Sequence, residues 1–448
     1  MRTVAVIDIG KTNVKVALVD LGLGAEVAVE TQANAVIPGP PWPHFDVAGQ
    51  WEFITAALRR LAAGARIEGI VVTTHGACAA LLDAAGELAA PVLDYEHTGP
   101  EARRAEYDAI RPDFGETGSP ALPMGLNLGA QLHWMLAEMP GLRDRVAQVV
   151  TWPGYWAHRL TGVAASDVCS LGCHTDLWNP WRGDWSGLVA RLGLTGRMAP
   201  ARRPEAVLGP LRPDLQARLG IGAVPVLAGI HDSNASLLPH LLAREAPFAV
   251  VSTGTWVISM AVGGAAVTLD PARDTLVNVN ALGAPVPSAR FMGGREHDLI
   301  RQGRAGAGSD AEAARVREGG VMLLPSVVAG SGPFPGRAHR WTQAPATEGE
   351  AAVALGYYLA LMTAECLGMI GAAGPSLIEG PFGANDAFLR MLAAATGRPV
   401  IASKARTGTA LGAALLFTEG ASEGVGGEIA PDAALLPYAE AWRRAVRA

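Results

Sequence analysis

Two apolar hairpins dominate the hydrophobic pattern of the chain. In "AVIDIGKTNVKVALVD", residues 5–20, an apolar run breaks at Gly-Lys-Thr-Asn and then resumes, which predicts strands over 3–9 and 14–19. The same plan returns in "FAVVSTGTWVISMAV", residues 248–262. Because the hairpins lie about one domain apart, we expect two halves that share one topology and meet near residue 240.

Other periodic stretches predict the elements between and after these hairpins. Apolar positions spaced by three and four residues indicate helices, and short apolar runs bounded by turn residues indicate strands. The expected helices cover 51–63, 128–137, 154–160, 350–371 and 386–395, and the expected strands cover 67–73, 224–228 and 376–380. The closing "TGTALGAALLF" predicts a small-residue helix, and the Pro/Gly-rich stretches 38–43 and 329–336 predict loops.

The composition is typical of a compact protein with a large interior. Half of the 448 residues are hydrophobic and only 17% are charged, so the chain is long enough for two domains. Its formal net charge is −6, and its Lys and Arg residues are scattered, which argues against a nucleic-acid partner. The sequence has no uncharged apolar run of roughly 18 residues, which argues against a membrane span. A homodimer is the expectation from base rates alone.

Cysteine usage and the start of the chain favour a cytoplasmic protein. The four cysteines lie in apolar surroundings and predict no disulfide framework, which fits a reducing compartment. The chain enters a strand at once, without the features of a secretory signal. Cys169, Cys173 and His174 could be metal ligands, but their spacing is not a common zinc spacing and no second ligand pair accompanies them, so packing is favoured.

The residues in the two hairpin turns suit phosphate binding. Turns rich in glycine and hydroxyl residues allow backbone N–H groups to converge on an anion. Asp8 would repel a bare phosphate, so its position at the end of the first strand predicts an intervening Mg²⁺ ion. Lys11 and Thr12 would add a positive charge and a hydroxyl donor. The second turn, "STGTW", would act through N–H and O–H donors only.

The order of motifs resembles one family of the actin/hexokinase/heat-shock ATPase fold. Neither turn matches a Walker A loop, and no Gly-x-Gly-x-x-Gly follows a strand, so P-loop and Rossmann folds are disfavoured. The series is instead similar to that of the FGGY family of carbohydrate kinases, over nearly the whole chain. The motifs are, in order, "DIGKTNVK", "HGACAALLDAAGE", "DYEH", "LTGVAASDVCSLGCHTDLW", "GIHDSNAS", "STGTW", "EGPFGANDAFLRMLAAATGRPV" and "TALGAALL".

This resemblance implies an α/β fold made of two duplicated actin/hexokinase-like (ribonuclease H-like) domains, with the active-site cleft between them. Residues 1–240 would bind a small-molecule sugar and supply the catalytic base, and residues 241–448 would bind ATP. The implied reaction is phosphorylation of the sugar by ATP with Mg²⁺.

The resemblance also implies roles for individual residues. Asp232 stands in the position of the catalytic base, which takes the proton of a sugar hydroxyl; a helix cap is the alternative for an Asp in this place. The residues implied in sugar binding are His75, Gly76, Asp94, Glu96 and His231, with structural histidines and a solvated turn as the alternatives. The residues implied in nucleotide binding are Gly10, Lys11, Thr12, Asn13, Thr253, Gly254, Thr255, Gly380, Gly383 and Asn385, and Asp8 is implied as the metal ligand. Trp51, Trp152 and Trp256 are expected to be packing residues.

Departures from the family pattern bear on the substrate. Thr407 stands where the family usually has an acidic residue, and the stretch 293–310 is shortened. The segment after "VTTHG" lacks the Gln-Met-His triplet of xylulose kinases, and its spacing is closer to that of rhamnulose kinases. The "HD" at the position of the catalytic base points the same way. We therefore expect a 6-deoxy-ketohexose, L-rhamnulose or L-fuculose, phosphorylated on its terminal hydroxyl. A ketopentose (xylulose or ribulose) or a polyol is the alternative substrate. A chaperone or a non-catalytic sugar/ATP-binding regulator of the same fold is the alternative function.

Overall fold

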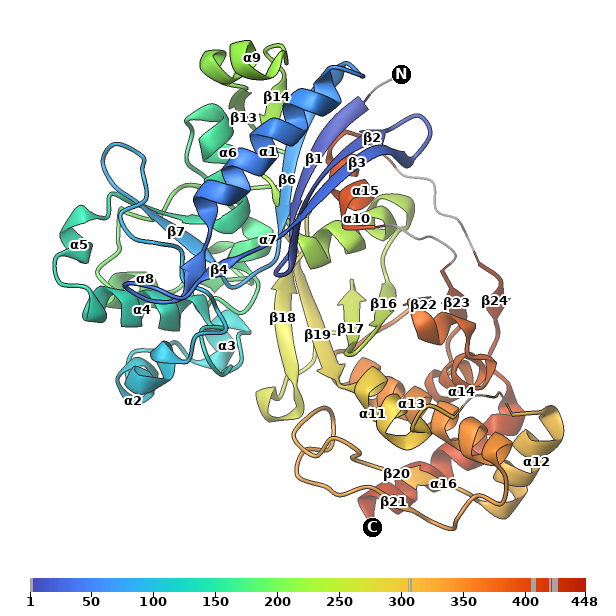
Figure 1. Ribbon diagram of the computed structural model, residues 1–448. Coiled ribbons are helices and arrows are strands. Elements are labelled where there is room, and N and C mark those ends of the chain that lie inside the picture. Colours follow the sequence, from blue (N-terminus) through green and yellow to red (C-terminus); the bar gives the residue numbers. More distant parts are fainter. Residues whose placement is uncertain (1–2, 305, 307, 404–407, 419, 421–425) are drawn as a thin grey trace. The chain divides into compact units, whose positions relative to one another are not determined.

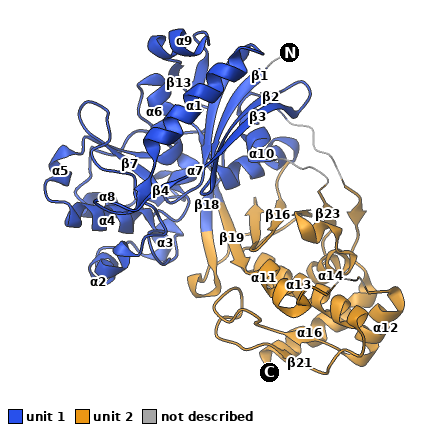
Figure 2. Ribbon diagram, viewed as in Figure 1, with its two compact units in different colours: residues 1–244, 277–285, 407–422 blue, residues 245–276, 286–406, 423–448 orange. Residues whose placement is uncertain are grey.

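The chain folds into two compact units, each made of more than one stretch of sequence (Figure 2). The structure is a computed structural model that describes residues 3–304, 306, 308–403, 408–418, 420 and 426–448. Unit 1 consists of Met1–Arg244, Val277–Pro285 and Thr407–Ser422, and unit 2 of Glu245–Leu276, Val286–Arg406 and Glu423–Ala448. Unit 2 begins close to the boundary predicted at 240/241, whereas the sequence pattern gave no sign of the two short returns to unit 1.

Unit 1 is built on a mixed seven-stranded sheet (Figure 1). Its strands are β1 (Thr3–Ile9), β2 (Asn13–Asp20), β3 (Ala25–Ala33), β6 (Ile67–Thr74), β13 (Val207–Pro210), β14 (Pro225–Leu227) and β15 (Ile230–His231). They lie in the order β13-β14-β6-β1-β2-β3, with β15 paired to β6. β1 is antiparallel to β2 and parallel to β6, and the remaining neighbours of β6 are also parallel to it.

The inner strands of this sheet are apolar because both of their faces are covered. β1 and β2 are buried at nearly every position, whereas β3 lies at the edge of the sheet and is mostly exposed. The main helices of unit 1 are α1 (Val47–Ala62), α4 (Leu128–Glu138), α6 (Trp152–Thr161), α9 (Pro213–Leu219), α10 (Asp232–Ala243) and α15 (Thr409–Ala414). α1 is amphipathic and buries Ile54 and Leu58 against the sheet, each of which stabilises the fold by about 1.5–3 kcal/mol.

Short elements complete unit 1 and form a second apolar cluster around α4. The short helices are α2 (Arg104–Asp108), α3 (Phe114–Thr117), α5 (Leu142–Arg145), α7 (Val168–Leu171) and α8 (Gly187–Arg191), and the short strands are β4 (Val36–Ile37), β5 (His44–Phe45), β7 (Ala79–Leu82), β8 (Gln148–Thr151), β9 (Ser166–Asp167), β10 (Trp178–Asn179), β11 (Asp184–Trp185) and β12 (Ala201–Arg202). Trp152 is fully buried and stacks on Tyr155, and Trp51 stacks on Trp156, so both act in packing as the sequence predicts.

Unit 2 repeats the central arrangement of unit 1. Its sheet is formed by β16 (Phe248–Thr253), β17 (Val257–Val262), β18 (Thr275–Val279), β19 (Pro285–Phe291), β22 (Ser376–Glu379), β23 (Val400–Ala402) and β24 (Glu428–Ile429). The order is β18-β19-β17-β16-β22-β23-β24. β16 is antiparallel to β17 and parallel to β22, just as β1 is antiparallel to β2 and parallel to β6. The prediction of two α/β halves with one topology is therefore confirmed.

The helices of unit 2 are grouped around one long buried helix. They are α11 (Gly293–Arg301), α12 (Asp310–Gly319), α13 (Glu348–Met369), α14 (Asp386–Thr396) and α16 (Leu436–Arg447), with the short strands β20 (Leu323–Leu324) and β21 (Arg340–Trp341) nearby. Among the described residues, α13 is the one helix long and apolar enough to cross a membrane. Within its apolar window 78% of the residues are buried in the protein, which is the burial expected of a core helix.

The element predictions agree closely with this structure. The helices expected at 350–371 and 386–395 are α13 and α14, and the strands expected in the first hairpin start and end within one residue of the prediction. The second hairpin, β16 and β17, spans the predicted stretch 248–262. α15 begins at Thr409; Thr407, which departs from the family pattern, lies outside the described residues.

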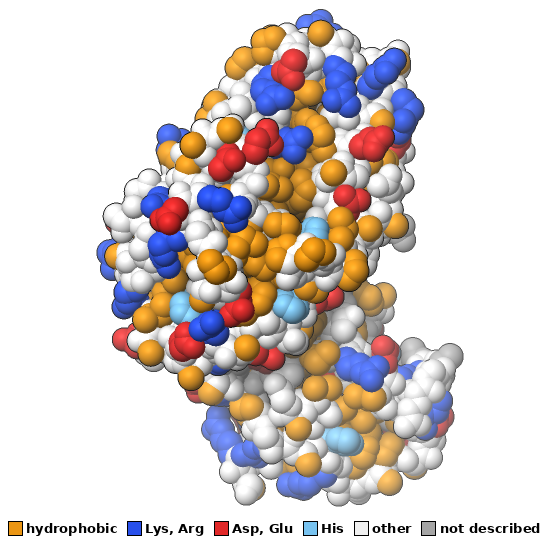
Figure 3. Space-filling view, turned by 60° about the vertical axis from the view of Figure 1, so that its left-hand side comes forward, with side chains coloured by type: hydrophobic (Ala, Val, Ile, Leu, Met, Phe, Trp, Pro, Cys, Tyr) orange, Lys and Arg blue, Asp and Glu red, His pale blue; other side chains and the backbone are white. Residues whose placement is uncertain are grey.

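On the face drawn in Figure 3, basic and acidic side chains are interspersed among hydrophobic ones.

Candidate active site

Parallel strand ends bring several predicted residues of unit 1 together. β6 lies between β1 and β15, and the register pairs Ile9 with Thr74 and Thr74 with His231. The backbone N–H of His75 donates to the Ile9 carbonyl at 3.0 Å. Ligands of open α/β sheets bind at the carboxyl ends of the strands. The side chains of His75, His231 and Asp232 therefore start from the edge of the sheet where a ligand is expected.

Asp232 is the first residue of α10, and its carboxylate is partly exposed. Its Oδ1 accepts hydrogen bonds from the backbone N–H of Ser233 at 2.6 Å and from the Ser233 hydroxyl at 3.4 Å. The Asp232 side chain is 35% exposed. Nδ1 of His231 also accepts from the Ser233 N–H, at 3.2 Å, and so takes the cap position of α10. The start of the helix thus orients the Asp232 carboxylate and stabilises its charge.

Asp8 is a largely buried carboxylate at the end of β1. Burial raises the pKa of Asp8 to about 6, the nearby Asp232 adds to this effect, and Lys15 opposes it. The Lys15 Nζ atom lies 3.5 Å from Asp8 Oδ2, across the hairpin register that pairs these two residues. Asp8 can serve as a Mg²⁺ ligand, because this ion commonly uses one or two carboxylates and completes its shell with water and substrate phosphates. The described part of the chain contains no group of three or more His, Cys, Asp or Glu residues that could form a complete metal cage.

The turn after β1 is closed by its own backbone. The N–H of Gly10 donates to the Asn13 carbonyl at 2.9 Å, and Thr12 and Asn13 are exposed. Asn34 braces the turn, since its side-chain amide donates to the Gly10 carbonyl at 2.6 Å and its backbone N–H donates to Thr12 O at 2.8 Å. The turn is held in one shape while its tip stays open to solvent.

Lys11 makes its ionic contacts with the predicted sugar-site carboxylates. Its amino group contacts Asp94 Oδ1 and lies 3.1 Å from Glu96 Oε2. The same amino group lies 4.7 Å from the centroid of the Tyr95 ring and 5.3 Å from that of Phe45. The sequence assigns Lys11 to phosphate and Asp94 and Glu96 to the sugar, and the structure brings the three residues into one cluster.

His75 is a buried imidazole with one free nitrogen. Its Nδ1 is 2.9 Å from the Gly76 carbonyl, so Nδ1 carries the proton and Nε2 presents a lone pair. Nε2 is buried and has no hydrogen-bond partner among the described residues. Burial lowers the pKa of His75, which keeps the ring neutral. A buried acceptor of this kind suits a ligand hydroxyl group.

Gly76 allows His231 to approach the end of β6. A Cβ atom on Gly76 would lie 2.6 Å from His231 Nε2 and 3.7 Å from the sulfur of Cys173. The first distance is shorter than the contacts that real Cβ atoms make. Any side chain at this position would displace the His231 ring. The role of Gly76 is therefore to leave room for its neighbours.

In unit 2, the hydroxyl of Thr253 is used within the protein. It donates to the Glu379 carbonyl at 2.5 Å and accepts from the Phe382 N–H at 3.1 Å. This bond pair ties the end of β16 to the short 3-10 helix Pro381–Ala384. Gly254 and Thr255 are exposed at the tip, where the Gly254 N–H donates to Trp256 O at 2.9 Å. Thr253 thus holds the shape of the turn, and the turn exposes Gly254 and Thr255 to solvent.

Two glycines permit close backbone packing around this turn. Gly380 has φ +82°, and a Cβ atom there would lie 2.0 Å from the Thr253 carbonyl oxygen. A Cβ atom on Gly294 would lie 2.0 Å from the Gly254 carbonyl oxygen. Gly380 was expected to make room for a nucleotide, and in the structure the absent side chain makes room for β16. At Gly383 a Cβ atom would be 3.5 Å from the Ile378 carbonyl, which is an ordinary contact.

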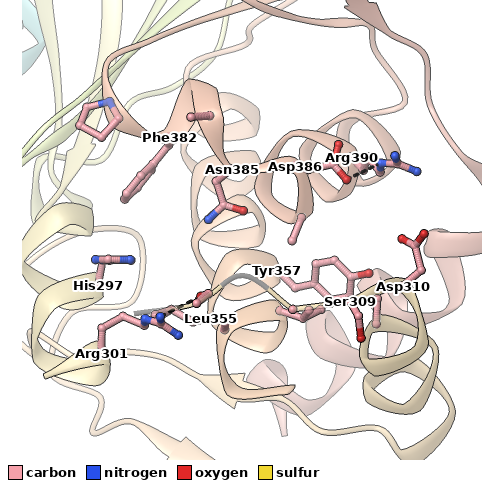
Figure 4. A pocket seen from close by; sticks show the side chains of 18 of the residues that line it. His297, Arg301, Ser309, Asp310, Leu355, Tyr357, Phe382, Asn385, Asp386 and Arg390 are labelled. Carbon is pink, nitrogen blue, oxygen red and sulfur yellow. Dashed lines mark hydrogen bonds and ion pairs between the residues drawn. The ribbon is translucent and has the colours of Figure 1, made fainter. Parts of the chain in front are cut away.

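A cavity of about 940 Å³ opens beside the tip of β16 and β17 (Figure 4). Gly254 and Thr255 are among its lining residues, and α11, α13 and α14 supply many of the others. His297 and Arg301 lie on one side of the cavity and Phe382 and Asn385 on the other, as Figure 4 shows. The volume is in the range of sites for small organic ligands.

The cavity confirms no residue role, but it shows which predicted residues lie together. Gly254, Thr255 and Asn385 share it, and Asn385 also caps α14 by accepting the Phe388 N–H at 3.0 Å. Sequence reasoning missed His297, Arg301, Tyr357 and Phe382 as lining residues. The only available signal was the position of the last of these inside the quoted "EGPFGAND". Lys15, also missed, could have been found, because a tight hairpin places it opposite Asp8.

Comparison with known proteins decides the family. Residues 3–239 match the N-terminal domain of the FGGY family of carbohydrate kinases, and residues 245–424 match the FGGY C-terminal domain. The chain belongs to the FGGY family. A crystal structure of a carbohydrate kinase from Novosphingobium aromaticivorans is 38% identical, with a TM-score of 0.91 over 99% of this chain and all of that one. A xyloylose kinase from Brucella ovis, 22% identical, shows the same fold with a TM-score of 0.81 over 100% of this chain and 98% of that one.

Curated FGGY relatives are more distant. An L-fuculokinase of Salmonella typhi is 28% identical over 58% of this chain and 57% of its own length. A xylulose kinase of Escherichia coli is 28% identical over 56% of this chain and 52% of its own length. A rhamnulokinase of Oceanobacillus iheyensis is 27% identical over 28% of this chain and 27% of its own length. The chain thus matches about half the length, or less, of these curated relatives.

Proposed function

We propose that this FGGY protein transfers the γ-phosphoryl group of ATP to the terminal hydroxyl of an open-chain ketose. A 6-deoxy-ketohexose, L-fuculose or L-rhamnulose, is the leading substrate, and a ketopentose such as xylulose or ribulose is the second candidate. The relatives named L-fuculokinase, rhamnulokinase and xylulose kinase support this range. In this proposal residues 1–240 bind the sugar and supply the base, and residues 241–448 bind ATP.

The observation that carries the proposal is the pair formed by Asp232 and His75 at the strand ends of unit 1. Asp232 offers a partly exposed carboxylate held by the start of α10, and His75 offers a buried Nε2 atom with no hydrogen-bond partner in the described part of the chain. A carboxylate at this place can accept the hydroxyl proton as the sugar oxygen bonds to the γ-phosphorus and the bond to ADP breaks. The lone pair of His75 would accept a hydrogen bond from a second hydroxyl of the sugar.

Charged groups near His75 would add further sugar contacts. Asp94 and Glu96 can each accept hydrogen bonds from hydroxyl groups, and their shared contact with Lys11 keeps them close together. A site that hydrogen-bonds hydroxyl groups discriminates strongly against sugars that lack one of them. The stereochemistry of the sugar carbons near this cluster would therefore set the specificity.

The nucleotide would bind in the cavity of unit 2. The hydroxyl group of the exposed Thr255 suits the phosphates, and the aromatic ring of Phe382 suits the adenine base. Asp8 would hold Mg²⁺ for the reaction. Bound Mg²⁺ neutralises charge that develops on the transferring phosphoryl group. Lys15 offsets the charge of Asp8 while the ion is absent.

The proposal is tested by measuring ADP release with Mg-ATP against a panel of ketoses, aldoses and polyols. We expect strong stimulation by a single ketose, L-fuculose or L-rhamnulose above all, and recovery of the phosphate on its terminal carbon. Asp232→Asn should lower kcat by about 10²–10⁴-fold, because the amide cannot accept the proton. The matched control is Asp214→Asn, which alters an exposed Asp in the first turn of α9, outside the proposed site.

Each outcome separates this proposal from its alternatives. Stimulation by one sugar that is lost in Asp232→Asn and kept in Asp214→Asn would support the kinase. Sugar binding without ADP release in the wild type would support a non-catalytic regulator instead. Full activity of Asp232→Asn would exclude Asp232 as the base even if the protein is a kinase.

A further inference from the structure

A buried cysteine, Cys173, lies beside the histidine that precedes the proposed base. Cys173 follows α7, is 6% exposed, and lies beside the imidazoles of His174 and His231. The proposed transfer of the phosphoryl group makes no use of this sulfur. Cys173 nevertheless contacts His231, and His231 directly precedes Asp232 in the chain.

The hydrogen bonds of the two histidines define which ring atoms face the sulfur. Nδ1 of His174 lies 2.7 Å from the Leu126 carbonyl, so Nδ1 carries a proton and Nε2 is the atom left for Cys173. Nδ1 of His231 lies 3.2 Å from the Ser233 N–H and 3.3 Å from Asp232 Oδ1. Nε2 of His231 lies on the opposite side of the ring, where it and the Cys173 sulfur both pack against Gly76.

The His231 ring therefore lies between two groups that can carry negative charge. Burial alone would raise the pKa of Cys173, but the imidazoles of His174 and His231 outweigh it and lower this pKa well below its usual range. Burial alone would lower the pKa of His231, but Cys173, Asp232 and Asp167 raise it to about 10. The Cys173 sulfur, the His231 ring and the Asp232 carboxylate thus follow one another in a single cluster.

We propose that Cys173 is a positioning residue for phosphoryl transfer: its sulfur fixes the His231 ring so that Nδ1 stays beside the Asp232 carboxylate and the first turn of α10. This rests on the proposed function, because it takes Asp232 as the base. Without the sulfur, the His231 ring loses its partner at Nε2 and can turn away from Asp232. A small misplacement of a catalytic group lowers the rate steeply.

Cys169 provides a comparison within the same segment. It lies four residues earlier, at 0% exposure, and has the charges of Asp167, Cys173 and Glu205 near it. Burial raises the pKa of Cys169 well above its usual value, the opposite of the direction at Cys173. Two neighbouring buried cysteines thus differ in their imidazole contacts, which makes Cys169 the matched control.

The test compares Cys173→Ala and Cys173→Ser with Cys169→Ala in the full-length protein. Cys173→Ala should lower kcat about tenfold or more while the KM for ATP stays unchanged, since the effect reaches only the base. Cys173→Ser keeps a small hydrogen-bonding atom and should restore part of kcat. Cys169→Ala should leave kcat and both KM values at the wild-type level. Thermal unfolding of all three variants shows whether each is folded.

A second readout needs no turnover. The ultraviolet absorbance of a thiolate near neutral pH should be present in the wild type and in Cys169→Ala, and lost in Cys173→Ala and Cys173→Ser. Nitrogen NMR should show the His231 ring signals shifted in the Cys173 variants and unchanged in Cys169→Ala. His231 ring signals that are the same in Cys173→Ala and in the wild type would overturn the proposal.

The kinetic outcomes separate this proposal from the proposed function. Normal kcat in folded Cys173→Ala would overturn the positioning role and leave the kinase assignment intact. An equal loss in Cys173→Ala and Cys169→Ala would also overturn it, because general packing would then explain the effect. Absence of turnover in the wild type with every sugar would overturn both proposals, even with the thiolate present.

Discussion

The hairpins β1–β2 and β16–β17 have the same strand arrangement but opposite chemistry at their turns. In unit 1 the turn region carries Asp8, Lys11 and Lys15, which form ion pairs or lie near other carboxylates. In unit 2 the turn carries Thr253, Gly254 and Thr255, with no charge. The first hairpin is organised by electrostatics and the second by backbone packing and hydrogen bonds.

This difference shows how one topology can supply two kinds of binding site. A charged turn can hold a metal ion and polar substrate groups, but its side chains must be neutralised by one another when no ligand is bound. A neutral turn can offer N–H donors to a phosphate without that cost, but it needs glycines to bring backbone segments together. Substitutions in the turn of unit 1 should therefore change KM values or the Mg²⁺ requirement. Substitutions in the turn of unit 2 should mainly lower the free energy of unfolding.

The largest expected effect is that of Gly380→Ala in unit 2. The new Cβ atom would lie 2.0 Å from the Thr253 carbonyl oxygen at a backbone φ of +82°, so strand or turn must shift. We expect the free energy of unfolding to fall by about 2–4 kcal/mol, with a lower Tm. Chemical denaturation followed by fluorescence measures this change.

Gly254→Ala is the control for that prediction. Its Cβ atom would meet nothing closer than the Trp256 carbonyl at 3.9 Å, so stability should stay near the wild-type value. If Gly254 presents its backbone to phosphate, this variant should instead raise the KM for ATP. Equal stability loss in both variants would contradict the view that close packing at Gly380 organises this turn.

The second prediction compares two lysines of the first hairpin. Lys11→Met removes the cation shared by Asp94 and Glu96, so we expect the KM for the sugar to rise about tenfold. Lys15→Met removes the cation beside Asp8, so we expect a changed Mg²⁺ requirement and little change in the KM for the sugar. Steady-state kinetics with each substrate varied in turn measures both.

The reverse pattern would restore the role that the sequence predicts for Lys11. If Lys11→Met raises only the KM for ATP, Lys11 binds phosphate when substrate is present and its contact with Asp94 belongs to the unliganded state. If both variants act alike, the two lysines are not separated in function and the comparison within this hairpin fails.

The fold could be predicted well because its pattern is carried by local sequence. The alternating and continuous apolar runs of β1, β2, β16 and β17 specify buried strands, and the 3.6-residue spacing of α1 and α14 specifies helices. The short returns of 277–285 and 407–422 to unit 1 depend on tertiary packing, such as Val279 against Trp178, which local sequence does not encode.

The site could be predicted only as far as residue types signal chemistry. Asp232 and Asp8 stand at strand ends, where a carboxylate is informative. The partners that give them their properties come from elsewhere in the chain, as Cys173 does for His231. The hydroxyl of Thr253 could be identified as a donor, but its use by the Glu379 carbonyl follows from the packing of β22 beside β16.

The smallest expected effect concerns pH and the neutral imidazole of unit 1. Burial lowers the pKa of His75 in the folded protein, so the unfolded chain binds more protons as pH falls through the ordinary histidine range. His75 therefore contributes stability that is fully present above its unfolded pKa, about 6.5, and that is lost as pH decreases below it. Denaturation at a series of pH values should show this slope, and His75→Gln should reduce it.

His297→Gln, which alters a partly exposed ring on the cavity of unit 2, is the control and should leave the slope unchanged. A slope that persists unchanged in His75→Gln would assign the effect to a group other than His75.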